Sequence, residues 1–154
     1  MARLDVHRLD PRTDVVLRSG PNWTAVLFFA CLSSLHLFIV LTDPAQVLDL
    51  TVKHSLLVGV TTIHPSVSHD PACDVYPGDH AFIRHKSFVH YAEARIEASQ
   101  KLINGVKQGM LVAKEILAED IFARVCKALT DSRFTAPRIK SFYEAAEAAR
   151  KKPD

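Results

Sequence analysis

The sequence predicts a single α+β domain in which a small barrel-like sheet is followed by C-terminal helices. The first observation is composition: 154 residues, 48% of them apolar and 23% charged, can bury one core but not two. The second is order, because strand-like runs fill the first two thirds of the chain and helical spacing fills the last third. We therefore expect an N-terminal arm at residues 1–22, the barrel domain at 23–130 and a C-terminal helix at 131–154.

The first expected elements lie in an apolar block, because residues 20–42 contain no charged side chain. This length approaches that of a membrane-spanning helix, and a small membrane-anchored protein is one interpretation. Two serines and a histidine lie at the centre of the block, where a bilayer helix would have to satisfy their polar groups. We therefore prefer two buried strands, Thr24 to Ala30 and Leu35 to Leu41, joined by a turn, and expect no membrane association.

Further strands are expected on both sides of a long loop. Residues 42–44 are a turn signal, and the β-branched run from Lys53 to Ile63 predicts the next strand. Residues 64–78 contain three prolines and two aspartates, which predicts a long loop. Strand-like alternation returns at Phe82-Ile83 and then at Ser87 to Ile96. In the second run we expect Phe88, His90, Ala92 and Ala94 on one face and Val89, Tyr91, Glu93 and Arg95 on the other.

The last third of the chain predicts two helices. Residues 118–129 place apolar side chains at helical spacing, and Glu119 and Asp120 lie in the first turn, where acidic groups favour the helix dipole. A break at residues 131–137 is followed by a second predicted helix from Arg138 to Lys152.

Charge and cysteine content exclude several classes of protein. A formal net charge of +2 is too small to indicate nucleic-acid binding by itself. Three widely spaced cysteines without a C-x-x-C pair support neither a disulfide framework nor a zinc ribbon, so we expect a reducing, cytoplasmic location. Cys31 and Cys126 have apolar neighbours typical of core residues, whereas Cys73 lies in a polar loop and is the only thiol worth a reactivity test.

The most informative segment runs from His64 to His90, because it contains five of the eight histidines together with several aspartates. Imidazole, carboxylate and thiolate groups are suitable ligands for a transition metal. Their spacing matches no known ligand pattern, however, and we expect no metal and no cofactor. The second interpretation is general acid–base catalysis, for which imidazole is suited because its unperturbed pKa lies near neutrality.

The best-placed acid and base candidates are Asp79 and His80, because the preceding Pro-Gly pair makes a sharp turn that could present both side chains together. In the alternative, Asp79 caps this turn through backbone bonds and His80 packs or hydrogen-bonds. Thr62, at the end of a predicted strand, could offer its hydroxyl to a phosphate. Three basic side chains could stabilise the phosphate charge: Arg84, Lys86 and Arg95.

Several common catalytic motifs are missing from the sequence. It contains no G-x-x-x-x-G-K-[ST], no strand-linked G-x-G-x-x-G and no G-x-S-x-G. Nucleotide hydrolysis, dinucleotide chemistry and a hydrolase of the nucleophile-elbow type therefore have no support.

Four segments, in their order, resemble the PemK/MazF toxin family of small SH3-like barrels. LHLFIVLTDP (35–44) looks like an apolar strand that ends in a loop, and LLVGVTTI (56–63) is similar to the family's strand ending in Thr-Ser. SFVHYAEARI (87–96) and LVAKEILAEDIFARVCKAL (111–129) resemble its later strands and C-terminal helix. The resemblance implies an SH3-like barrel over roughly residues 35–130.

The resemblance also implies a function, namely metal-independent cleavage of single-stranded RNA by attack of the ribose 2′-hydroxyl, restrained by an antitoxin partner. Thr61 or Thr62 matches the family's catalytic Thr or Ser, whereas residues 43–51 contain no match for its loop arginine. We expect an endoribonuclease toxin that is able to form a homodimer and in which Thr62, Asp79 and His80 are catalytic. A non-catalytic barrel that binds a protein or RNA partner is the alternative.

Overall fold

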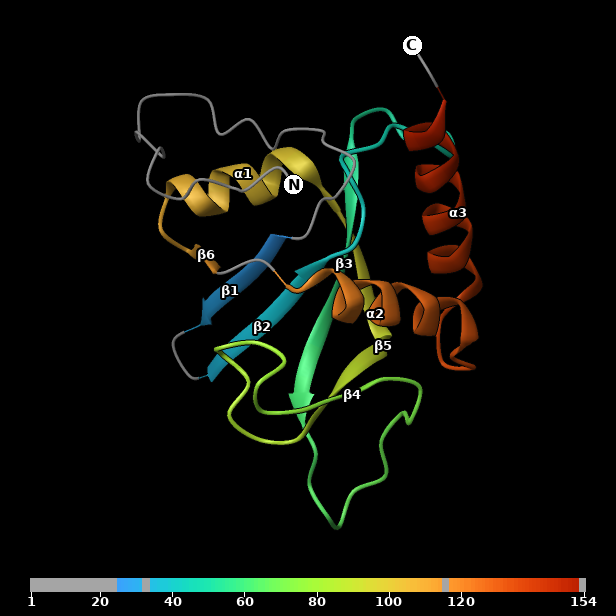
Figure 1. Ribbon diagram of the computed structural model, residues 1–154. Helices are drawn as coiled ribbons and strands as arrows, with labels where there is room; N and C mark the ends of the chain where they lie inside the picture. The colour runs from blue at the N-terminus through green and yellow to red at the C-terminus, as the bar shows by residue number, and fades with distance from the viewer. Residues whose placement is uncertain (1–24, 32–33, 115–116, 153–154) are drawn as a thin grey trace.

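The computed structural model describes residues 25–31, 34–114 and 117–152. Its strands form one antiparallel sheet in the order β4-β5-β3-β2-β1-β6, and its helices pack against that sheet (Figure 1). The α+β class is thereby confirmed, whereas the predicted N-terminal arm lies outside the described residues. The elements in chain order are β1 (Ala25–Cys31), β2 (Ser34–Val40), β3 (His54–Thr62), β4 (Asp74–Val75), β5 (Ser87–Ala98), α1 (Ser99–Lys107), β6 (Leu111–Lys114), α2 (Glu119–Asp131) and α3 (Pro137–Lys151).

The apolar block forms a β-hairpin. Strands β1 and β2 pair in register from Ala25 opposite Val40 to Cys31 opposite Ser34, which confirms the two predicted strands. The other edge of β1 pairs with β6, so its backbone groups are satisfied within the sheet. In the described part of the chain, no helix has the length and apolarity needed to cross a membrane.

The sheet is curled like half of a barrel, with β4 and β6 at its edges. Each edge strand is short, and no pairing between described residues joins one to the other. The barrel expected from the sequence is therefore present only as a curled, open sheet in the described residues.

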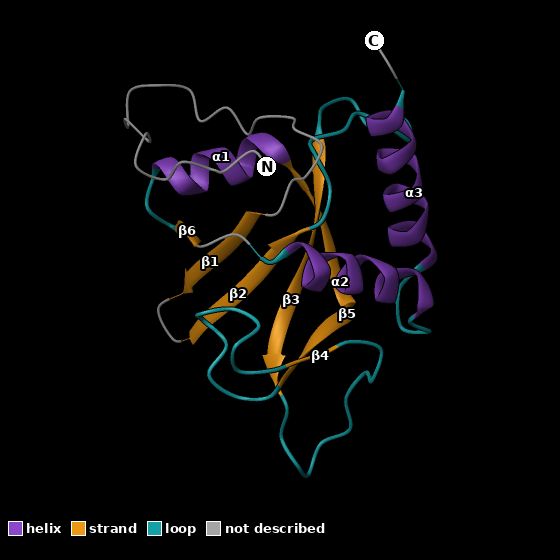
Figure 2. Ribbon diagram, in the orientation of Figure 1, coloured by secondary structure: helices purple, strands orange, loops and turns teal. Residues whose placement is uncertain are grey.

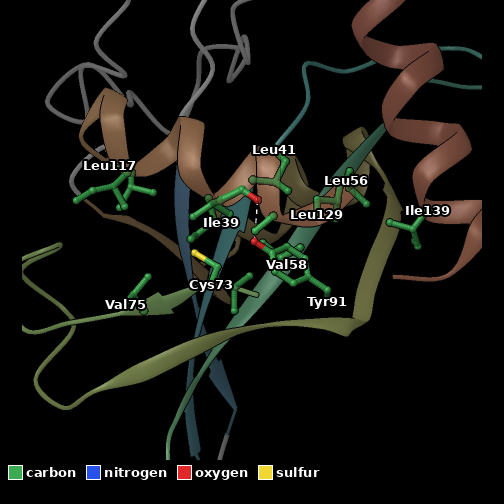
Figure 3. Close-up of a cluster of buried hydrophobic side chains, with 14 of the residues drawn as sticks. Ile39, Leu41, Leu56, Val58, Cys73, Val75, Tyr91, Leu117, Leu129 and Ile139 are labelled. Atoms are coloured by element: carbon green, nitrogen blue, oxygen red, sulfur yellow. Dashed lines mark hydrogen bonds between the residues drawn. The ribbon is translucent and has the colours of Figure 1, made fainter. Parts of the chain in front are cut away.

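The two faces of the sheet are covered by different helices (Figure 2). On β2, Leu37 and Ile39 belong to the main core with side chains of α2 and α3, while Val40 packs on the opposite face with Leu57 and with Leu102 of α1. This alternation follows from the two-residue period of a strand. The main core includes Ile39, Leu56, Val58, Tyr91, Leu129 and Ile139 (Figure 3).

One buried tyrosine ties the sheet to α2. The Tyr91 side chain is completely buried, and its hydroxyl donates a hydrogen bond of 2.7 Å to the backbone carbonyl of Val125. This bond removes the cost of burying an unpaired hydroxyl. Strand β5 and helix α2 are therefore fixed relative to each other.

A bulge in β5 contradicts the alternation predicted for this strand. The pairing of β3 with β5 changes register at Val58, which stands opposite the four residues 91–94. Such a bulge inverts the faces of the residues that follow it. Ala94 therefore packs against the main core, as Val89 and Tyr91 do, rather than sharing a face with Phe88 and His90 as predicted. Arg95 lies over the ring of Phe38, 5.3 Å from its centroid.

The two C-terminal helices confirm the sequence prediction closely. Helix α2 has Glu119 and Asp120 in its first turn, and α3 begins with Pro137 at its N-terminus, where a missing N–H costs nothing. Their buried faces contact the main core through Val125, Leu129, Ile139 and Phe142, among others. Residues 132–136 form the break between them.

Two local features differ from the prediction. Helix α1 was not predicted, because it lacks a side-chain N-cap and contains Gly105, a poor helix former. A Cβ atom there would lie 2.7 Å from Cδ1 of Leu111, so a larger residue would force the Leu111 side chain to shift. The predicted strand character of Phe82-Ile83 is wrong, because Phe82 lies in a turn and Ile83 is buried as part of the loop before β5.

Candidate functional site

The long loop between β3 and β5, residues 63–86, is fastened to the connection between α2 and α3. The buried Asp70 carboxylate accepts the backbone N–H of Ala72 at 2.9 Å and the hydroxyl of Ser132 at 2.6 Å. The Ser132 oxygen also accepts the backbone N–H of Phe134 at 3.1 Å. Two segments far apart in the sequence are thus joined by one buried hydrogen-bonded link.

Beside this link lies a cleft of about 690 Å³. Its walls come from the end of β3, the loop, β5 and the α2–α3 connection. The polar groups that line it include Thr62, His64, His69, His90 and Arg133. Three histidines of the segment that stood out in the sequence therefore meet in one place, although they are separated along the chain.

His69 is the centre of a charged network at the cleft. Its Nε2 atom lies 3.2 Å from Oδ1 of Asp74, and the side chain is 24% exposed. The other carboxylate oxygen of Asp74 lies 3.7 Å from Nζ of Lys86, whose ammonium stands 5.4 Å from the centroid of the Tyr76 ring. The Asp74 carboxylate thus holds the imidazole through its Nε2 atom.

His90 borders the same cleft from β5. The centroid of its ring lies 5.3 Å from that of the Phe88 ring. The centroid of the His69 ring lies 5.0 Å from the same Phe88 centroid. Nδ1 of His90 is 3.6 Å from Oε2 of the exposed Glu93. Two imidazoles with different carboxylate partners therefore flank one buried phenyl ring.

Strand register brings two of the predicted site residues to this region. Thr62 is paired with Ser87, and the backbone N–H of Ile63 donates to the carbonyl of Lys86 at 3.0 Å. Thr62 lines the cleft and Lys86 reaches its Asp74–His69 network. The backbones at residues 62–63 and 86–87 are thus neighbours.

Asp79 and His80 are placed differently. His80 is only 6% exposed, and its Nδ1 accepts the backbone N–H of Phe82 at 3.1 Å. Oδ2 of Asp79 accepts the backbone N–H of Tyr76 at 2.8 Å and lies 3.1 Å from Nη2 of Arg124 on α2. These contacts correspond to the structural alternative, in which Asp79 caps the turn and His80 packs inside the fold.

The remaining predicted phosphate contacts do not line the cleft. Arg84 is exposed in the loop before β5. Arg95 lines a second cleft of about 530 Å³, between α1 and the sheet. Arg95 stands opposite Leu57 and His90 opposite Gly59, so Arg95 shares a face of the sheet with His90 but lies beyond the bulge, nearer α1.

Sequence reasoning did not identify Arg133 and Phe134 as site residues. The guanidinium carbon of Arg133 lies 4.8 Å from the centroid of the Phe134 ring, and both side chains line the cleft. The only sequence signal was a basic residue in a helix break, which by itself indicates ordinary surface. Their role becomes visible once the Asp70–Ser132 link brings this connection beside the loop.

Cys73, the only thiol that the sequence marks for a reactivity test, is buried. Cys73 is 3% exposed and belongs to the main core. Burial raises the pKa of the Cys73 thiol, although the neighbouring Arg124 guanidinium opposes this effect. Burial also raises the pKa of Cys126 to about 11. Neither thiol is therefore activated as a nucleophile.

Among the residues that the structure describes, no three His, Cys, Asp or Glu side chains come together in an arrangement able to hold a metal ion. Comparison of the chain with protein-family models, with curated proteins and with solved structures finds no match. The chemistry of the cleft is therefore argued from its own geometry.

Proposed function

We propose that this protein cleaves single-stranded RNA in the cleft between the β3–β5 loop and the α2–α3 connection, without a metal ion. The observation that carries the proposal is the placement of His69 and His90 around Phe88, in a cleft that Arg133 also lines. Cleavage of an RNA phosphodiester needs one base, one acid and a cation near the phosphate. The cleft supplies all three kinds of group.

In the proposed reaction, one imidazole removes the proton of the ribose 2′-hydroxyl as that oxygen attacks phosphorus. The bond from phosphorus to the 5′-oxygen breaks, and the second imidazole donates a proton to this leaving oxygen. The products are a 2′,3′-cyclic phosphate and a free 5′-hydroxyl. Asp74 orients His69, while Arg133, Lys86 and the hydroxyl of Thr62 stabilise the negative charge that develops on the phosphate oxygens.

This reaction is the one that the PemK/MazF resemblance implies, and Thr62 keeps the role that the resemblance assigns to it. Under the proposal, the curled sheet is the described part of an SH3-like barrel, and the protein acts as a toxin restrained by an antitoxin. Proton transfer moves from Asp79 and His80 to His69 and His90, because the former pair is engaged inside the fold.

The test is cleavage of an end-labelled single-stranded RNA by the purified protein in the presence of EDTA, resolved on a gel. We expect products ending in a cyclic phosphate and no cleavage of DNA with the same sequence. His69→Ala and His90→Ala should each lower the rate constant by about 10²–10⁴-fold. His85→Ala is the matched control, because His85 is an exposed histidine of the same loop that does not line the cleft.

Two results would contradict this proposal. One is the absence of RNA cleavage by the wild-type protein, and the other is cleavage by both histidine variants at the wild-type rate. RNA binding without cleavage would favour the alternative of a non-catalytic binding module.

A further inference from the structure

Two exposed apolar side chains border the candidate cleft. Phe134, in the α2–α3 connection, is 43% exposed, and Val67, in the β3–β5 loop, is 62% exposed. Large apolar groups left in water at the edge of a cleft are typical of ligand-binding sites. Both lie in the same cleft as the histidines, although neither is used by the proposed reaction.

Phe134 is held in place before any ligand binds. Its backbone N–H donates to the hydroxyl oxygen of Ser132, which in turn donates to the buried carboxylate of Asp70. The guanidinium of Arg133 lies against the ring itself, 4.8 Å from the centroid. A ring fixed in this way loses little freedom when a planar ligand stacks on it.

We propose that Phe134 and Val67 form a subsite for a nucleobase adjacent to the phosphate contacted by Arg133. This inference rests on the proposed function and deepens it. An aromatic surface beside a cation matches one nucleotide, whose base stacks while its phosphate pairs with the charge. A base inside a duplex is already stacked on both faces, so the subsite selects unpaired RNA.

The subsite is tested by binding, with cleavage blocked. Fluorescence anisotropy would measure the affinity of a short, fully 2′-O-methylated oligonucleotide and of an abasic oligonucleotide of the same length. Phe134→Ala should weaken binding of the first by about tenfold to a hundredfold and leave the second unchanged, since base stacking on an aromatic side chain has this magnitude. Phe134→Tyr should retain wild-type affinity, because the aromatic face is kept.

Met110→Ala is the matched control, because Met110 is an exposed apolar residue that lines the other cleft. It should bind both oligonucleotides like the wild type. Equal weakening of both oligonucleotides by Phe134→Ala, or of neither, would overturn the subsite while RNA cleavage still supports the proposed function. Failure of the wild-type protein both to bind and to cleave RNA would overturn the proposed function and the subsite together.

Discussion

Removing the Ser132 hydroxyl should loosen the joint between the two walls of the cleft. This hydroxyl donates to the Asp70 carboxylate at 2.6 Å and accepts the Phe134 N–H at 3.1 Å, and Ser132 is 2% exposed. A hydrogen bond to a charged group contributes about 1.5–3 kcal/mol and a neutral one about 0.5–1.5 kcal/mol. Ser132→Ala should therefore lower the free energy of unfolding by about 2–4 kcal/mol.

Urea denaturation followed by circular dichroism measures this loss. Ser141→Ala is the control, because Ser141 is exposed on α3 and such a surface substitution should change stability by less than about 0.5 kcal/mol. A double-mutant cycle with Asp70→Ala isolates the link, and we expect a coupling energy of about 1–2 kcal/mol between residues 70 and 132. A loss below about 0.5 kcal/mol for Ser132→Ala, or strictly additive effects, would refute the reasoning.

Two further predictions concern charge and backbone strain. Burial raises the pKa of Asp43 from 3.8 to about 6, despite the neighbouring Arg150, and Oδ1 finds no hydrogen-bond partner among the described residues. The raised pKa means that the folded protein favours the protonated carboxyl of Asp43. The contribution of this group to the free energy of unfolding is therefore complete below pH 4 and is lost as pH rises through 6. Asp43→Asn should therefore raise the free energy of unfolding by about 1 kcal/mol at pH 8, a value discounted for partial exposure, and should leave it unchanged at pH 4. Thermal melts that show equal effects at the two pH values would contradict this. Leu48 has a φ of 51° in an exposed turn, so Leu48→Gly should raise the free energy of unfolding, measured by urea denaturation, by about 0.5–1 kcal/mol. Val52→Gly should lower it. The same sign at both positions would exclude backbone strain as the cause.

The segments with one dominant local signal could be predicted from the sequence. Helices α2 and α3 have apolar side chains at helical spacing and favourable terminal residues, and both were predicted within a few residues of their observed bounds. The hairpin of β1 and β2 followed from strand-like content interrupted by polar residues at its centre. Helix α1 has weak helical propensity and is stabilised by packing, through Leu102 and by the close approach of Gly105 to Leu111, so its local signal was absent.

The candidate site could be located from the sequence only to within a segment. The concentration of histidines and aspartates between His64 and His90 pointed to the correct loop and strand. Which of these residues meet was decided by long-range contacts. Asp79 turned toward Arg124 on α2, and Asp74 instead became the partner of His69.

The sequence by itself determined the α+β class, the main strands and the C-terminal helices, because these depend on periodicities and turn residues that lie close together in the chain. The tertiary structure alone decided the curl of the sheet, the bulge in β5, and the position of Arg133 and Phe134 at the cleft. The physical reason is distance along the chain. The Asp70–Ser132 link joins residues 62 positions apart, and no local pattern encodes which buried carboxylate will meet which hydroxyl.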